Sequence, residues 1–352
     1  MRKKKEISID SDPRRRAWLE IYPAAIESNA RNIKELLMAG CSLMAVVKAD
    51  GYGHGAETVA RAALYGGANQ LGVATLQEGI DLRRAGINCP ILILGNLVDI
   101  EDLRACIYWD LMPTISHLKE ALISEHLAAD TGKIFGLQIK VDTGMTRLGC
   151  DLKDAQSLIE NVHEASSLEL KGVYTHLALA DKSFHETSIT KKQQESFESL
   201  IKSLPFPPYF SRHIANSAGT FQNKSLHYDM VRVGLAIYGY SPINDSLLHC
   251  KLQSALSVKA RVSLIRDVPT GVGVSYGHLF TTSRVSRLAV VGIGYGDGVS
   301  RNLSGKISVI FRDQFIPQVG AITMDQLVID ITDYPDLVVG SIVTLLGQDK
   351  NS

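Results

Sequence analysis

The chain has 352 residues, of which 45% are hydrophobic and 21% charged, an ordinary globular composition at a length that suits two domains or a barrel with an appended domain. Its 37 basic residues balance 37 acidic ones, so the net charge provides no general attraction to nucleic acids or anionic membranes. The five cysteines are scattered and include no C-x-x-C pair, which favours a reducing compartment over a disulfide framework.

The chain begins with a basic segment, MRKKKEISIDSDPRRR, and no apolar stretch follows it. It therefore lacks the apolar centre of a signal peptide, and no run approaches the roughly 18 apolar residues of a spanning helix. We expect a flexible tail at residues 1–16 and a cytoplasmic protein that binds neither membranes nor nucleic acids.

From Ala17 to about Tyr240, short apolar runs alternate with helical patterns such as DLKDAQSLIENVHEASS, in which apolar residues recur at helical spacing behind Asp151. This alternation predicts βα units and a parallel sheet. The predicted strands are residues 42–47, 70–74, 90–94, 111–115, 135–142, 170–176, 210–215 and 230–233.

Eight strands with intervening helices predict a closed (β/α)₈ barrel of the TIM type over residues 17–245. An open doubly wound sheet is the alternative, although no G-x-G-x-x-G follows the first strand, which weakens its dinucleotide-binding version. From residue 246 to 352, closely spaced strands with Gly, Pro and Asp turns predict a smaller, mainly β domain.

The active site of such a barrel lies at the C-terminal ends of its strands. Lys48 has that position, since it ends an apolar run and precedes a loop whose three glycines permit close backbone approach to a ligand. Position alone leaves two interpretations open. Lys48 is either a solvated charge at a strand end or a pocket lysine whose neutral amine attacks an aldehyde.

The string VVKADGYGHG around Lys48 resembles the pyridoxal-phosphate lysine motif of the alanine racemase family. Seven further blocks resemble the family in the same order along nearly the whole chain: KVDTGMTRLG, YTHLALAD, HIANSAG, VRVGLAIYG, VSYGHLF, GYGDGVSR and ITMDQ. The resemblance implies a barrel followed by a β domain, with pyridoxal 5'-phosphate as cofactor. It also implies interconversion of L- and D-alanine, which supplies D-alanine for peptidoglycan synthesis.

The resemblance further implies a two-base mechanism in a homodimer with shared active sites. Lys48 would form the Schiff base with the cofactor and act as one base, and Tyr276 from the partner subunit would act as the other. His176 and Arg232 would form a hydrogen-bonded chain that supports the tyrosine. Arg232 would face the pyridine nitrogen and leave it largely unprotonated, because arginine holds its own proton, and this disfavours transamination.

The remaining family positions surround the cofactor and the substrate, and no metal is implied. Lys140 lies in an apolar strand, where it is either the carbamylated lysine of some relatives, which orients the neighbouring arginine, or a lysine that points out to water. The other matches are Tyr52, Ser217, Gly234 and Leu235 for the phosphate, Asn216 beside them, Arg147 and Met324 for the substrate, and Asp181, Tyr295 and Arg301 along the substrate corridor.

Two departures from the family pattern matter. Ala321 and Thr323 replace an arginine and a cysteine of the family segment G-R-I-C-M-D, which puts the corridor charge and the substrate preference in question. The chain also ends at Ser352, before the family's Arg-x-x-Arg-x-Tyr ending, so we expect weaker packing of the β domain and low turnover.

Four alternative functions stay open. The chain could be a serine or broad-specificity amino-acid racemase, because pocket size alone rejects an added hydroxyl poorly. An amino-acid decarboxylase of the same architecture would place an acidic residue at the pyridine nitrogen, against Arg232. A cofactor-homeostasis protein would consist of the barrel alone, against Tyr276. Cofactor binding with low turnover would follow from the missing C-terminal tail.

Overall fold

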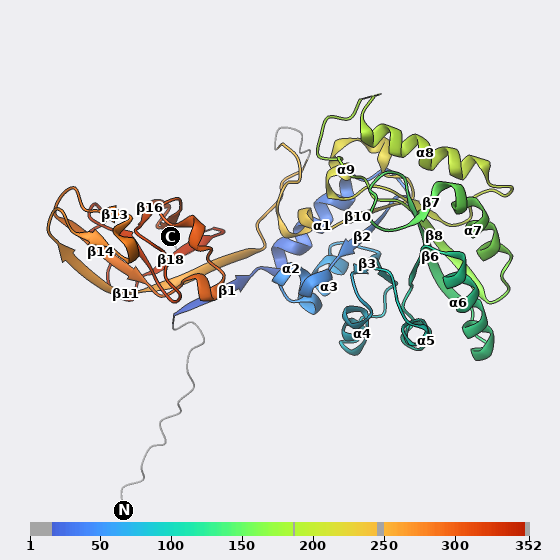
Figure 1. The fold of residues 1–352 in the computed structure, drawn as a ribbon, viewed down its shortest axis with the longest axis horizontal. Coiled ribbons are helices and arrows are strands. Elements are labelled where there is room, and N and C mark those ends of the chain that lie inside the picture. Colours follow the sequence, from blue (N-terminus) through green and yellow to red (C-terminus); the bar gives the residue numbers. More distant parts are fainter. Residues whose placement is uncertain (1–15, 186, 245–249, 349–352) are drawn as a thin grey trace, which may run out of the picture. The chain divides into compact units, whose positions relative to one another are not determined.

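The computed structural model describes residues 16–185, 187–244 and 250–348, which fold into two compact units (Figure 1). One unit runs from Tyr22 to Ala255, and the other joins the segment up to Ile21 with the chain from Leu256 onward. The expected tail lies outside the described residues, except for Arg16.

The barrel unit runs from Tyr22 to Ala255, which differs at both ends from the predicted barrel of residues 17–245. Strand β1 (Ala17–Ile21) pairs antiparallel with β11 (Leu256–Val268) in the β unit, with Leu19 opposite Val258. The reason is physical: an apolar strand pattern shows that a strand forms but does not specify which sheet it joins.

The first unit is a closed barrel of eight parallel strands, and each predicted strand is present close to its predicted bounds. Two parallel sheets, ordered β10-β2-β3-β4 and β5-β6-β8-β9, meet along two seams. Leu92 forms a parallel β-bridge with Met112 at one seam. At the other seam, the backbone N–H of Arg232 donates to Ala215 O at 3.0 Å. The open doubly wound sheet is therefore wrong. The strands are β2 (Ser42–Val46), β3 (Gln70–Val73), β4 (Ile91–Ile93), β5 (Thr114–Ile115), β6 (Phe135–Asp142), β8 (Leu168–Tyr174), β9 (Ser211–His213) and β10 (Met230–Val233).

Helices form the outer layer of this unit and bury their apolar faces against the strands. In the predicted helix behind Asp151, now α7 (Leu152–Glu164), Ala155, Leu158, Ile159 and Val162 are buried, as their spacing indicates. The others are α1 (Pro23–Leu36), α3 (Ala56–Tyr65), α4 (Leu76–Arg84), α5 (Ile100–Trp109), α6 (Leu118–Thr131), α8 (Ile189–Ser203) and the short α9 (Ser217–Gln222). In the described part of the chain, none is long and apolar enough to cross a membrane.

Alternation along the strands separates two apolar layers. Leu43, Ala45 and Val47 pack with the helices, whereas Met44 belongs to a second, smaller cluster that also contains Leu92, Tyr174 and Met230. Because successive side chains of a strand point to opposite faces, this second cluster lies inside the barrel.

The second unit is an antiparallel β structure in which β11, β14, β17, β16, β15 and β18 close on themselves through the β11–β18 pairing. Lys259 on β11 is almost fully buried and forms an ion pair of 3.0 Å with Glu20 on β1. This pair ties the first strand to the unit. The strands are β12 (Gly273–Val274), β13 (Phe280–Thr281), β14 (Ser286–Val291), β15 (Ser308–Phe311), β16 (Gln314–Val319), β17 (Leu327–Asp330) and β18 (Ile342–Leu346).

Candidate active site

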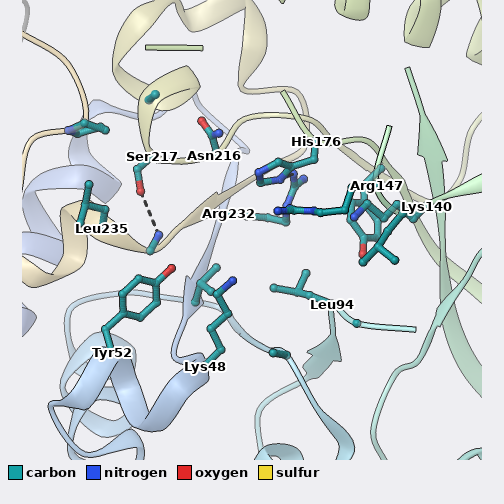
Figure 2. Close-up of a pocket in the computed structure, with 18 residues that line it drawn as sticks. Lys48, Tyr52, Leu94, Lys140, Arg147, His176, Asn216, Ser217, Arg232 and Leu235 are labelled. Atoms are coloured by element: carbon teal, nitrogen blue, oxygen red, sulfur yellow. Dashed lines mark hydrogen bonds between the residues drawn. The ribbon is translucent and has the colours of Figure 1, made fainter. Parts of the chain in front are cut away.

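A cavity of about 470 Å³ opens at the C-terminal ends of the barrel strands (Figure 2). Figure 2 shows Tyr52, Ser217 and Leu235 at one end of the cavity and Lys140, Arg147 and His176 at the other, with Lys48 and Arg232 between them. All ten barrel residues predicted for the catalytic, cofactor or carbamylation roles line it: Lys48, Tyr52, Lys140, Arg147, His176, Asn216, Ser217, Arg232, Gly234 and Leu235.

Lys48 begins a turn that winds in the left-handed direction. In this turn, α2 (Lys48–Gly53), φ is 51° at Ala49, 51° at Asp50 and 54° at Tyr52. Left-handed backbone costs a residue with a Cβ about 1–2 kcal/mol, and such strain gathers at functional sites. The expectation of a glycine-permitted loop therefore missed the main feature, since residues other than glycine adopt the unfavourable conformation.

Glu78 holds this turn through its carboxylate. Its Oε1 accepts a hydrogen bond from the Ala49 N–H at 2.7 Å, and its Oε2 accepts from the N–H groups of Ala74 at 2.7 Å and Thr75 at 3.1 Å. Glu78 also completes the capping box of α4 with Thr75. One carboxylate thus connects the backbone just after β3 with the backbone next to Lys48, which follows β2.

Three polar groups meet at the end of the cavity that Ser217 lines. The Ser217 hydroxyl accepts a hydrogen bond from the Gly234 N–H at 3.1 Å (Figure 2), and the side-chain Oδ1 of Asn216 accepts from the Gly219 N–H at 3.0 Å. A Cβ on Gly234 would lie 2.7 Å from the Tyr52 hydroxyl oxygen. Burial raises the pKa of Tyr52, so its hydroxyl keeps its proton and can donate. Hydroxyls and a backbone N–H without bulky side chains suit a phosphate group.

Arg232 is buried on β10 and makes directional contacts with its surroundings. Its Nη2 donates to Thr175 O at 2.7 Å and to His176 Nδ1 at 3.3 Å, and its Nη1 donates to His213 Nδ1 at 2.9 Å. The guanidinium also lies 4.9 Å from the centre of the Tyr174 ring. Burial lowers the pKa of Arg232 to about 10, which still leaves the group protonated at pH 7.

His176 is a neutral imidazole in this environment. Burial, and then the positive charge of Arg232, lower the pKa of His176 to about 3. Because an arginine can only donate, His176 Nδ1 accepts and the ring proton lies on Nε2. The predicted Arg232–His176 chain is therefore present, with its proton at the far nitrogen.

Lys140 lies inside the barrel with only 5% of its surface exposed, so the alternative of a lysine pointing out to water is wrong. Its Nζ lies 5.7 Å from the centre of the Tyr174 ring. Burial, together with the charges of Arg232 and Arg147, lowers the pKa of Lys140 to about 8. Arg147 is exposed at the rim of the same cavity.

Five further predicted residues lie elsewhere in the described chain and do not line this cavity. Asp181 is exposed on the barrel unit, where it pairs with Lys182. Tyr276, Tyr295, Arg301 and Met324 belong to the β unit. Tyr276 is 70% exposed and Met324 is 55% exposed, which is unusual for side chains of that size.

Two loops of the β unit bring Tyr295 and Met324 together. The Tyr295 N–H donates to Thr323 O at 2.9 Å, and the Gly296 N–H donates to Met324 O at 2.8 Å. The Thr323 hydroxyl donates within its own loop to Gln326 O. The hydroxyl that Thr323 brings in place of the family cysteine is thus hydrogen-bonded within its own loop.

Sequence reasoning missed three residues that support the site without lining the cavity: Glu78, Gln138 and His213. Gln138 is two positions before Lys140 on β6 and therefore faces the barrel interior as Lys140 does, a signal that period-two alternation contains. His213 starts the HIANSAG block. Glu78 had only its capping position as a signal.

Two family models match the chain, "Alanine racemase, N-terminal domain" over residues 21–242 and "Alanine racemase, C-terminal domain" over residues 255–352. The alanine racemase of Prochlorococcus marinus is 60% identical over 344 residues, which cover 97% of this chain and 89% of that protein. The alanine racemase of Synechocystis sp. is 45% identical over 344 residues, 96% of this chain and 90% of that protein.

Solved structures agree with this assignment. Alanine racemase from Bartonella henselae with covalently bound pyridoxal phosphate superposes with a TM-score of 0.84 at 32% identity, covering 95% of this chain and 91% of that one. Alanine racemase from Bacillus anthracis with bound L-Ala-P has a TM-score of 0.84 at 35% identity, covering 96% and 87%. This chain belongs to the alanine racemase family, whose members are pyridoxal-phosphate-dependent isomerases.

Proposed function

We propose that this chain interconverts L- and D-alanine with pyridoxal 5'-phosphate as its cofactor. One observation carries the proposal: the amine of Lys48, the buried guanidinium of Arg232 and the polar groups around Ser217 line one cavity. Each has a counterpart in the cofactor, namely its aldehyde, its ring nitrogen and its phosphate.

The residues present fit this cofactor. Ser217, the backbone of Gly234 and Leu235, and the Tyr52 hydroxyl would hold the phosphate, with Asn216 supporting the loop. Arg147 would contact the phenolic oxygen and the substrate carboxylate. When bound, the cofactor supplies an electron-withdrawing ring that stabilises negative charge at the substrate α carbon.

Two bases on opposite faces would move the α proton. Lys48 Nζ removes or returns it on one face, and the phenolic oxygen of Tyr276 does so on the other. His176 would support the tyrosine through its Nε2–H, because its Nδ1 accepts from Arg232. Arg232 stays protonated and would face the ring nitrogen of the bound cofactor, where it would leave the ring a weaker electron sink and favour quick return of the proton. A decarboxylase would need the stronger sink that an acidic residue provides.

The exposed Tyr276 and Met324 support a homodimer in which Tyr276 of the partner subunit completes each site. Met324 would line the substrate pocket, and Asp181, Tyr295 and Arg301 would border the corridor that leads to it. A dilution series across the dissociation range tests this, with loss of activity per chain expected as monomers form. Full activity in a proven monomer would contradict the dimer requirement.

We also propose a cytoplasmic location and a role in supplying D-alanine for peptidoglycan. Five free cysteines, three of them buried, suit a reducing compartment.

The decisive experiment incubates purified protein and cofactor with L-alanine, D-alanine and L-serine separately and follows the loss of optical activity. We expect racemisation of both alanine enantiomers and none with Lys48→Ala. Racemisation that survives in Lys48→Ala would overturn the mechanism. Faster racemisation of serine would replace alanine as the substrate, and cofactor binding without turnover of any of the three would favour the binding-protein alternative.

A further inference from the structure

His213, the last residue of β9, is fully buried and contacts a neighbour with each ring nitrogen. Its Nε2 lies 2.9 Å from Oε1 of Gln138, and its Nδ1 lies 2.9 Å from Nη1 of Arg232. The three side chains thus form a continuous polar chain through the barrel interior that ends at the guanidinium.

Only one distribution of protons satisfies this chain. The Arg232 guanidinium can only donate, so His213 Nδ1 accepts and the ring proton lies on Nε2. That Nε2–H needs an acceptor, which the Gln138 amide oxygen provides. The reversed amide would face an N–H with its NH₂ group and leave a buried donor without an acceptor, so the orientation of Gln138 follows from the same argument.

Packing holds the three side chains of this polar chain in place. The His213 ring stacks on the Tyr174 ring with 4.8 Å between the ring centres and 10° between the ring planes. Arg232 lies over the Tyr174 ring as well. Gly172 on the intervening strand β8 makes room, because a Cβ there would lie 3.0 Å from the Gln138 amide. Burial, helped by the charge of Arg232, holds the pKa of His213 well below its usual value, so the ring is neutral.

We infer that Gln138 and His213 are positioning residues: Gln138 holds His213 in its Nε2–H tautomer, and His213 Nδ1 then orients the Arg232 guanidinium toward the cofactor ring nitrogen. The inference rests on the role proposed above for Arg232. Without Gln138, the histidine can adopt the Nδ1–H tautomer and direct a hydrogen at the guanidinium, which turns an attraction into a repulsion.

The test compares the wild-type holoenzyme with Gln138→Glu and Gln138→Met by three measurements. The ¹⁵N spectrum of histidine-labelled protein reads the His213 tautomer, the absorption spectrum of the bound cofactor reads its ring environment, and steady-state kinetics separate kcat from KM. Gln138→Glu adds a charge that favours protonation of both ring nitrogens, and Gln138→Met removes the acceptor at similar volume.

We expect protonated Nε2 and unprotonated Nδ1 at His213 in the wild-type protein. In both variants we expect a shifted cofactor spectrum and a kcat about 10- to 100-fold lower, the range that loss of such a supporting partner produces at metal-bound histidines, with KM for alanine changed much less. Gln194→Glu is the matched control, since Gln194 is also buried but lies on α8, where its Nε2 donates to Ser225 O. Its spectrum and kcat should stay those of wild type.

A wild-type His213 that carries its proton on Nδ1 would overturn the inference, as would variants whose spectrum and kcat match the control. If Gln138→Glu fails to fold, Gln138→Met decides by the same criteria. A wild-type protein that binds cofactor but does not racemise alanine would refute the proposed function, whereas the tautomer and the cofactor spectrum would still test this inference.

Discussion

Glu78→Gln should loosen the turn that carries Lys48 without touching the cavity itself. The substitution keeps the size of the side chain but replaces one carboxylate oxygen with an NH₂ group that cannot accept. One oxygen of Glu78 serves the Ala49 N–H, and the other serves the N–H groups of Ala74 and Thr75. We expect the glutamine oxygen to keep the two bonds from Ala74 and Thr75, so the Ala49 N–H will face the NH₂ group of the new side chain.

The magnitude follows from the bonds lost. A hydrogen bond to a charged group contributes about 1.5–3 kcal/mol. The bond from the Ala49 N–H is lost in the variant, and it holds a turn whose left-handed residues cost about 1–2 kcal/mol each. Since about 1.4 kcal/mol corresponds to a factor of ten, we expect the cofactor dissociation constant to rise about 10- to 100-fold, with a lower kcat.

Titration of the apo form with cofactor, followed by absorbance, measures this constant, and thermal unfolding reports stability in the same samples. Glu57→Gln is the control, because Glu57 forms an exposed pair with Arg61 on α3 and the substitution should change neither quantity appreciably. A cofactor affinity of Glu78→Gln within twofold of wild type, despite a lower melting temperature, would refute the idea that Glu78 positions the lysine.

Three further predictions concern the cavity and the second base. Tyr276→Phe should lower racemisation at least ~100-fold, while exchange of the α proton with D₂O, followed by NMR, continues for one enantiomer only; exchange of both would contradict two bases. Gly234→Ala should weaken cofactor binding in a titration about tenfold, because the added Cβ meets the Tyr52 hydroxyl. Gly136→Ala is its control, because the atoms nearest the added Cβ belong to the flexible side chain of Lys171. Lys140 should give a carbamate signal with ¹³C-bicarbonate that grows from pH 7 to 9, because its pKa near 8 leaves more neutral amine as the pH rises; an equal signal in Lys140→Arg would assign it elsewhere.

The barrel was predictable because its strands are buried on both faces and read as short apolar runs between helical patterns. Strand β1 is not among the predicted strands, and it joins the β unit, since pairing depends on contacts far away in the sequence. Local pattern therefore identified the barrel strands but neither strand β1 nor the sheet that it joins.

The candidate site divides in the same way. Lys48 and its loop form one contiguous string, so the sequence alone sufficed to select them. The left-handed turn was not predictable, because Ala49 and Asp50 ordinarily avoid that conformation and adopt it here under contacts such as that of Glu78. Gln138 and His213 are far apart in the sequence, and only barrel closure brings them together.

The electrostatics of the cavity explain why a chain with no net charge suits an anionic cofactor. Lys48, Lys140, Arg147 and Arg232 line the cavity, and among the described residues that line it there is no Asp or Glu. Their mutual repulsion contributes to the lowered pKa values of Lys140 and His176. A cofactor phosphate, a substrate carboxylate and a carbamate on Lys140 would each bring negative charge into this field. Each anion is attracted by cations that the fold itself holds together, and each lowers the positive potential that remains for the next, so the electrostatic attraction should fall as the cavity fills.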